Sequence, residues 1–450
     1  MIATSWLLRP TVIIFFTLSF IASNMIIPSQ GFCLKNLYRS TEPLPEKYKE
    51  IQFEEIVKAG KFIDYIEKSG ILYYNEELEE YLNGIARKMT PPLYADAEKV
   101  KIYIKMTRDP TVNAVSLANG NIYLNIGILA RTKNEAQLAF ILGHEISHII
   151  NRDMVYFSED YYSKTIATQF LDLALSPATA FFGLYGISQL GFGLIYGVTV
   201  TGYRRDQEER SDIESVALMN QNGYALEGAV ELLNIFIEEK EKFSKGSEIY
   251  FLSSHPENEK RKRDIEKLIK TSYNSVENAT RNEDIFLNKM TNLKVENAML
   301  NVMFDRPQHA IDNLIKVENA HPEDEKVYFC LAEAYRVVAK DPDLLKYELS
   351  NKAWREIGIN SKEKREQQIK EWKEQAKDYY GKALGVNPLY ADPYRGMALI
   401  YANDEEDEKA LDSFRKYLEL QPDAKDRRFV NNWIERLKKK SEEKKEKKEE

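Results

Sequence analysis

Residues 140–150 read FILGHEISHII, and the interpretation of the whole chain starts from them. They place two of the five histidines, His144 and His148, four residues apart, with Glu145 directly after the first. On an α-helix, side chains four residues apart lie on one face and can bind one metal ion together. Glu145 lies one step round the helix, where a carboxylate can serve as general base toward a water on the metal. The pattern therefore predicts a peptide-hydrolysing site with one zinc ion per chain.

The residues around this pattern predict a helix that is apolar on nearly every side. Its apolar members are Phe140, Ile141, Leu142, Ile146, Ile149 and Ile150. Asn134 is suited to cap the start of the helix, with Gln137 completing a capping box. The alternative, a histidine pair that binds no metal, fits this helix poorly because buried imidazole nitrogens need partners.

A catalytic zinc ion usually takes three protein ligands and leaves one position for water. The segment DQEERSD, residues 206–212, offers Glu208 and Asp212 on one helical face. The first is placed to bind the metal and the second to orient a histidine through its far ring nitrogen. From the residues alone, Glu209 competes with Glu208 for the ligand role.

Composition limits the functions open to the chain. With 450 residues it can form two or three domains, each with its own core. A net charge of −8 and a pI near 5.6 give no general attraction to nucleic acid, so no nucleic-acid partner is expected. Only two cysteines are present, so any metal must rely on histidines and carboxylates.

Two segments raise the question of export and membrane contact. An apolar run over residues 11–27 follows a single arginine, which predicts a signal peptide over residues 1–31 with an uncleaved anchor as the alternative. Residues 166–201 are also apolar, but Pro177 and several glycines divide them into short pieces. We interpret this stretch as buried helices or a flap over the site, with peripheral membrane contact as the alternative.

The remaining pattern predicts helices around a small sheet, followed by helical repeats. Residues 38–90 have helical periodicity, 99–109 alternate like a strand, and 113–129 predict two short strands around Asn119-Gly120. Residues 392–422 match the 34-residue tetratricopeptide pattern, and Pro388 lies one period before Pro422. Residues 340–372 are expected to hold a degenerate or inserted helix pair. Such repeats stack into a solenoid with a concave binding face.

Taken together, these motifs resemble the zinc metallopeptidase family of HtpX-like heat-shock proteases and CAAX prenyl proteases. The combination with a signal sequence and repeats is most similar to the periplasmic β-barrel assembly-enhancing branch. The resemblance implies an α+β, mainly helical gluzincin-like domain over 38–270, a linker over 271–287, and an all-α tetratricopeptide solenoid over 288–436. We expect the charged tail, residues 437–450, to be disordered.

The resemblance also implies roles for individual residues. It makes Glu208 the third metal ligand. It makes Asp212 a residue that contacts a ligand without binding the metal itself. Asn113, Ala114 and Gly120 match the strand beside which substrate lies in the family, although Val115 stands where relatives carry Phe. His255 matches the family's His-Pro motif; it is either a latch or oxyanion stabiliser, or only an anchor for the next helix.

Two further positions are compared with the family. Arg261 matches an arginine of the family motif, and Asp153 stands where relatives often carry a histidine. The function that the resemblance implies is a periplasmic endopeptidase for misfolded or misassembled outer-membrane proteins. Its repeats would bind protein substrates or the outer-membrane assembly machinery. Two alternatives remain open: a chaperone-like repeat scaffold with a latched metal site, and a membrane-embedded protease of the HtpX type.

Overall fold

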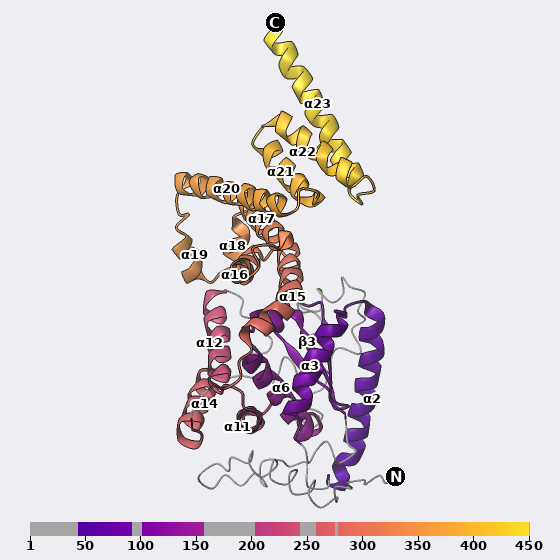
Figure 1. Ribbon diagram of the computed structural model, residues 1–450, viewed down its shortest axis with the longest axis vertical. Coiled ribbons are helices and arrows are strands. Elements are labelled where there is room, and N and C mark those ends of the chain that lie inside the picture. Colours follow the sequence, from indigo (N-terminus) through magenta and orange to yellow (C-terminus); the bar gives the residue numbers. More distant parts are fainter. Residues whose placement is uncertain (1–43, 92–100, 157–202, 244–257, 275–277, 450) are drawn as a thin grey trace, which may run out of the picture.

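The computed structural model describes residues 44–91, 101–156, 203–243, 258–274 and 278–449. Residues 1–31, 166–201 and His255, which carry three of the predictions above, lie outside these ranges. A part with a small sheet occupies one end of the molecule, and helices stack away from it toward the C-terminus (Figure 1). Within the described ranges, no helix has the length and apolar character needed to cross a bilayer. The predicted α+β class with a following all-helical region is confirmed.

The sheet has three strands in the order β1-β3-β2. These are β1 (Tyr103–Thr107), β2 (Ala114–Ser116) and β3 (Asn121–Asn125). β1 pairs with β3 in parallel, and β2 pairs with β3 in antiparallel fashion through the predicted turn. Gly120 adopts a positive φ of 91° in that turn, a conformation that costs glycine little.

Alternation along β3 assigns its two faces to different helices. Ile122 and Leu124 face the main core, whereas Tyr123 packs edge-on against Phe62 of α2 (Glu46–Ser69). On the core side lie α3 (Glu76–Met89), the short α5 (Ile126–Arg131) and α6 (Glu135–Ile150). The sheet therefore separates α2 from the helix that carries the histidines.

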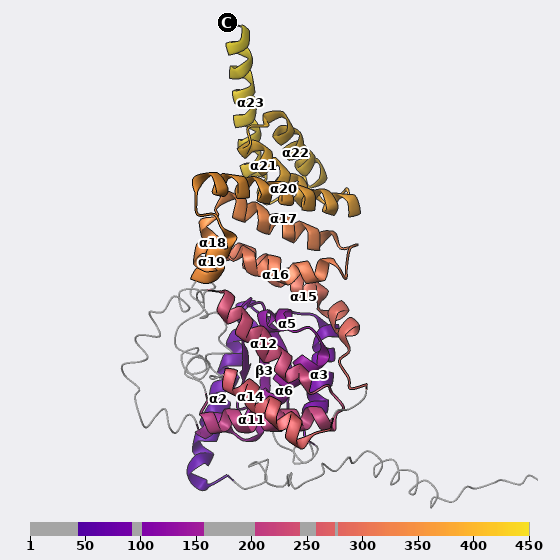
Figure 2. The ribbon, with the colours of Figure 1, turned by 90° about the vertical axis from the view of Figure 1, so that its left-hand side faces the viewer.

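The helix with the histidines lies at the centre of this first part. All sixteen residues of α6 are buried. Around it pack α11 (Arg205–Gln221) and α12 (Glu227–Lys242), with α14 (Asn258–Ser272) beyond them (Figure 2). α6 and α11 approach closely because Gly143 has no side chain; a Cβ there would lie 2.6 Å from the Ser215 hydroxyl.

One helix joins the two parts of the molecule. The first half of α15 (Glu283–Met303) places Phe286, Met290 and Leu293 in the core around α6, and its second half places Ala298 and Val302 in the core of the following helices. The boundary predicted at 287/288 therefore falls inside one helix. The described part of the predicted linker is also fixed, because Thr280 exchanges backbone hydrogen bonds with Gly223 and Ala225.

Helical pairs continue from α15 to the C-terminus (Figure 2). They are α16 (Pro307–Glu318), α17 (Glu325–Lys340), α18 (Asp343–Glu348), α19 (Asn351–Ile357), α20 (Lys362–Val386), α21 (Ala391–Asn403), α22 (Asp407–Leu420) and α23 (Arg427–Glu449). α18 and α19 are the inserted helix pair expected between 340 and 372. The tail expected to be disordered is instead helical to Glu449, since it extends α23.

We predict that the substitution Gly143→Ala separates α6 from α11. The added methyl group would overlap the Ser215 hydroxyl and the Met89 side chain, and such overpacking costs about 1–3 kcal/mol. Faster hydrogen–deuterium exchange of the α6 amides and a lower free energy of unfolding are expected. The control is Gly381→Ala in α20, where a Cβ meets nothing within 4 Å and a gain of up to ~1 kcal/mol is expected. Unchanged exchange in the Gly143 variant would contradict the close packing.

Candidate metal centre

The α6 helix starts where its capping residue predicts. The Asn134 side chain accepts a hydrogen bond of 3.0 Å from the Gln137 backbone N–H. The capping box differs in detail: the Gln137 side chain accepts from the Lys133 N–H, one residue earlier than expected. The next residue, Glu135, is buried and accepts hydrogen bonds from the hydroxyls of Tyr81 and Tyr224. These contacts fix the register of the helix.

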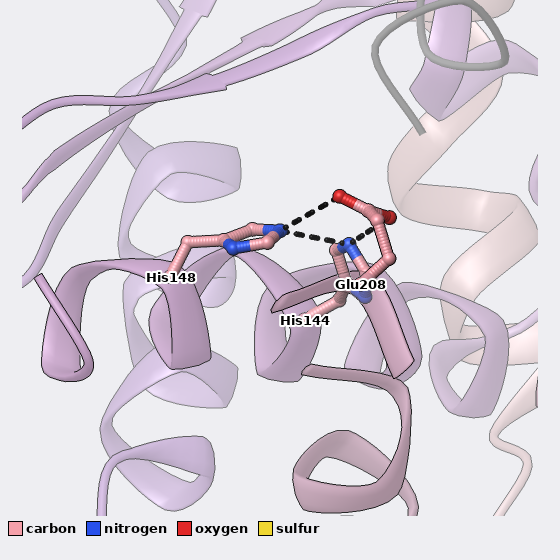
Figure 3. A group of neighbouring side chains, drawn as sticks. All are labelled: His144, His148 and Glu208. Atoms are coloured by element: carbon pink, nitrogen blue, oxygen red, sulfur yellow. Dashed lines mark hydrogen bonds and ion pairs between the residues drawn. The ribbon is translucent and has the colours of Figure 1, made fainter. Parts of the chain in front are cut away.

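Three side chains converge at the middle of α6 (Figure 3). The Nε2 atoms of His144 and His148 lie 3.1 Å apart. The two carboxylate oxygens of Glu208, on α11, lie 3.5 Å from Nε2 of His144 and 3.4 Å from Nε2 of His148. All three residues are buried, and their ligand atoms lie within 4.8 Å of one another. The structure thus brings together the three residues predicted to bind the metal.

The partners of the Nδ1 atoms show which nitrogen of each ring faces the centre. Nδ1 of His144 lies 3.0 Å from Asp212, and Nδ1 of His148 lies 2.8 Å from Asp153. An ionised carboxylate can only accept, so each Nδ1 carries a proton, and Nε2 is the ring nitrogen that faces the centre and can bind a proton or a metal ion. Two Nε2 atoms and a carboxylate at this range need positive charge between them, which a proton or a metal ion supplies.

The spacing of the donor atoms fits zinc. Tetrahedral zinc with bonds of about 2.0–2.1 Å places its donor atoms roughly 3.3–3.4 Å apart. The two Nε2 atoms lie 3.1 Å apart, and each lies 3.4 or 3.5 Å from one of the two Glu208 oxygens, which is close to that value. Two imidazoles and one carboxylate are also a donor set of catalytic zinc, which keeps a fourth position for water. His144, His148 and Glu208 would hold such an ion.

The electrostatic surroundings also favour a cation. Burial alone would lower the pKa of His148, but Asp153 and Glu208 outweigh it and raise the pKa to about 10. The pKa of His144 is raised in the same sense, with Asp212 and Glu208 overcoming burial. The negative charge that favours a proton at these nitrogens equally favours a metal ion.

Asp212 occupies the position predicted for it. Its carboxylate contacts Nδ1 of His144 and accepts two hydrogen bonds from Arg261, at 2.7 and 2.8 Å. Burial would raise the pKa of Asp212, but the Arg261 guanidinium lowers it to about 2. The carboxylate therefore stays ionised and fixes the His144 tautomer. Arg261, which the sequence comparison noted without a role, supplies the compensating charge from α14.

Asp153 is the functional residue that the sequence reasoning missed. It holds His148 as Asp212 holds His144, and it is itself bound by the Arg210 guanidinium and the Gln207 amide of α11. The chain reverses after α6 because Arg152 adopts a positive φ of 57°, which turns Asp153 back toward the helix. The available signal was the carboxylate five residues after His148, noted above only as a departure from the family pattern.

Glu145 and Tyr203 complete the surroundings of the centre. Glu145 is buried on α6 one residue from His144, and it is near enough to help raise the pKa of Tyr203 above its usual value, an effect in which burial is largest. The Tyr203 ring stacks on the His148 ring with 3.9 Å between centroids, and its hydroxyl is hydrogen-bonded to Ser116. Tyr203 therefore connects the metal ligand with the end of β2.

The remaining predicted residues divide into three groups. Glu209 is exposed, so the structure favours Glu208 over Glu209 for the role of metal ligand. Asn113 lies immediately before β2, Ala114 is the first residue of β2, and Gly120 lies in the turn after it. β2 is an edge strand that contacts α6. His255 lies outside the described residues.

Comparison with known proteins agrees with this geometry. The sequence of residues 75–269, which contain both histidines and Glu208, matches the model of peptidase family M48. Residues 75–269 form a peptidase family M48 domain. The family resemblance inferred from the sequence is thereby confirmed, and the M48 domain includes α14, whose Arg261 binds Asp212.

Several named proteins are similar to the M48 domain and its surroundings. The beta-barrel assembly-enhancing protease of Yersinia pestis is 22% identical over 206 residues, which are 45% of this chain and 41% of that protein. The protein of the same name from Escherichia coli K12 is 21% identical over 206 residues, with the same coverage. The mitochondrial metalloendopeptidase OMA1 of Schizosaccharomyces pombe is 28% identical over 167 residues, 37% of this chain and 46% of that protein. The chain thus matches less than half the length of these relatives.

We predict that Glu208→Gln abolishes tight metal binding and that Glu209→Gln does not. The two variants remove one carboxylate charge from neighbouring positions, but only Glu208 faces the histidines. The expected loss of zinc affinity exceeds the roughly 10–100-fold that follows from losing an outer partner of a ligand. Zinc content and competition with a chelator measure it. Equal affinities in the two variants would contradict the assignment.

For Asp153→Asn we expect zinc affinity to fall by about 10–100-fold, because His148 loses the carboxylate that fixes its tautomer. Asp206→Asn is the matched control, since the ion-pair partner of Asp206 among the described residues is the exposed Arg204. Chelator competition on both variants provides the measurement. A role for Asp153 confined to folding would lower the unfolding temperature and leave the affinity of the folded protein unchanged.

Proposed function

We propose that the protein is a zinc-dependent endopeptidase. The observation that carries the proposal is the convergence of two imidazole Nε2 atoms and one carboxylate, with separations of 3.1, 3.4 and 3.5 Å, and with Glu145 adjacent on the same helix. Membership of residues 75–269 in peptidase family M48 supports the same activity. Relatives named as proteases and as a metalloendopeptidase support it further.

The residues of the chain suggest how hydrolysis proceeds. When bound, zinc supplies Lewis-acid chemistry, which polarises the scissile carbonyl and lowers the pKa of water. Glu145 accepts a proton from the attacking water and later donates it to the leaving amine. Asp153 and Asp212 keep both imidazoles in the tautomer that turns Nε2 inward. β2, with Asn113, Ala114 and Gly120 at and around it, offers an edge to which an extended peptide can add as a further strand.

The proposed substrates are misfolded or misassembled outer-membrane proteins in the periplasm. Two relatives are named for enhancing β-barrel assembly, which supports this substrate class. The apolar run over residues 11–27 supports export. Stacked helices from α15 to α23 provide the surface on which we place substrates or the outer-membrane assembly machinery.

One observation favours a second candidate, a scaffold whose metal site is latched. His144, Glu145 and His148 are each no more than 1% exposed, so a peptide reaches them only after neighbouring segments move. In this candidate the helical repeats escort client proteins and cleavage is rare. The two candidates differ in whether an unfolded substrate is cut.

The decisive experiment compares the wild type with Glu145→Gln on an unfolded protein substrate. Both should bind one zinc ion, because Glu145 is not a ligand in the proposal. Cleavage should fall by roughly 10²–10⁴-fold in the variant, the usual contribution of general acid–base catalysis. If both proteins bind zinc and neither cleaves any unfolded substrate, the peptidase proposal fails and the scaffold takes its place.

A further inference from the structure

A cavity of about 570 Å³ lies where the M48 domain meets the helical repeats, away from the metal centre. The end of α5, the end of α12, α15 and α16 line it. Its walls include apolar side chains, and its charged lining consists of five Lys or Arg residues and three carboxylates. The apolar members are Ala130, Ile235, Phe243, Leu287, Ile315 and Val317. Pockets of this size accommodate small organic ligands.

Ion pairs account for part of the charge in this cavity. Arg131 binds Glu239 at 3.0 Å, and Lys242 binds Asp312. The third carboxylate, Glu238, is exposed. After these pairs are set aside, three lysines still face the cavity: Lys133, Lys294 and Lys316. In the ranges that the structure describes, none of the three has a carboxylate within ion-pair distance.

The excess of positive charge is energetically unfavourable because Lys294 is buried. Its side chain is only 6% exposed, and its ammonium donates to the backbone carbonyls of Ala130 and Thr132, at 2.6 and 3.0 Å. An ammonium has three hydrogens, so one is left without an acceptor among the described residues. Burial, together with the positive charges of Arg131, Lys316 and Lys133, lowers the pKa of Lys294 to about 7. A buried charge normally requires a counter-charge.

We propose that this cavity binds a small amphipathic oxyanion, with its charged head between Lys133, Lys294 and Lys316 and its apolar body against Phe243 and Ile315. A sulfate-like or phosphate-like head provides several acceptors for the ammonium groups of the three lysines that line the cavity. The bound anion supplies the missing acceptor of Lys294. Because the walls come from both parts of the chain, it also joins the M48 domain to the repeats. A lipid headgroup and a soluble organic phosphate share this chemistry.

Calorimetric titration of the full chain with hexyl sulfate tests the proposal. The probe carries a permanent charge on an apolar body, and hexanol is its uncharged counterpart. The wild type should bind hexyl sulfate saturably and not hexanol. The double variant K133Q/K316Q, which changes two exposed side chains, should bind about tenfold more weakly or worse. The control K364Q/K370Q removes the same charge from exposed positions of α20 and should bind like the wild type.

Proton uptake provides a second readout, centred on Lys294. An anion beside an amine of pKa about 7 raises that pKa, so binding at pH 7.5 should take up protons. Hexyl sulfate does not titrate near this pH, so the uptake belongs to the protein. Binding enthalpies in buffers of different ionisation enthalpy measure it, and Lys294→Met should remove it.

These measurements distinguish the two possible sources of the anion, and they also include outcomes that contradict the proposal. Binding to phosphatidylglycerol vesicles that is lost in K133Q/K316Q assigns the site to a lipid headgroup. Hexyl sulfate binding with no vesicle binding assigns it to a soluble ligand. The proposal is overturned if hexyl sulfate does not bind, or if the control double variant weakens binding as much as K133Q/K316Q does. Neither result depends on peptidase activity.

Discussion

The complete burial of α6 is the constraint on which the rest of the structure depends. A helix with two histidines and a glutamate at its centre is enclosed on every side, so each polar side chain must find a partner within the protein. These partners include Asp153 in the turn after the helix, Tyr81 of α3, Asp212 and Glu214 of α11, and Asn282 before α15. The peptidase part is therefore organised around satisfying one polar helix, and its apolar core surrounds that helix.

This constraint explains why the charged side chains around the two histidines form linked networks and not isolated ion pairs. Asp153 and Asp212 each stand behind one histidine, and two buried carboxylates would cost several kcal/mol each without compensation. Arg210 and Arg261 supply it, one from α11 and one from α14. Both imidazoles are thus coupled to the packing of α11, and His144 is coupled to α14 as well. A shift of α11 would displace the partners of both histidines and Glu208, whereas a shift of α14 would act on His144 through Asp212.

Sequence signals within one helix were enough to predict the centre of this arrangement. Contacts between residues far apart in the sequence could not be predicted in this way. Spacing along one helix identified His144, Glu145 and His148, and capping chemistry located the start of α6 within its first turn. Glu208 needed the family resemblance, because Glu209 has the same chemistry and only burial separates them. Asp153 was missed because its role requires a left-handed residue, Arg152, to reverse the chain, and a non-glycine residue gives no sequence signal of that conformation. The boundary expected at 287/288 falls inside α15, and only the three-dimensional structure shows that the two halves of this helix pack in different cores.

The shared helix has a consequence for how the repeats act. A flexible linker would let the repeats turn freely, so that a bound partner met the M48 domain in many orientations. α15 excludes this, because a rotation between the two parts would have to bend a helix whose residues Leu293 and Val295 already pack in different cores. The contact is reinforced where Phe243 stacks on His309 and where Lys242 binds Asp312. In the proposed function, a protein held on the repeats would therefore meet the M48 domain in one orientation, and the reach of the site would be set by where on the repeats that protein is held.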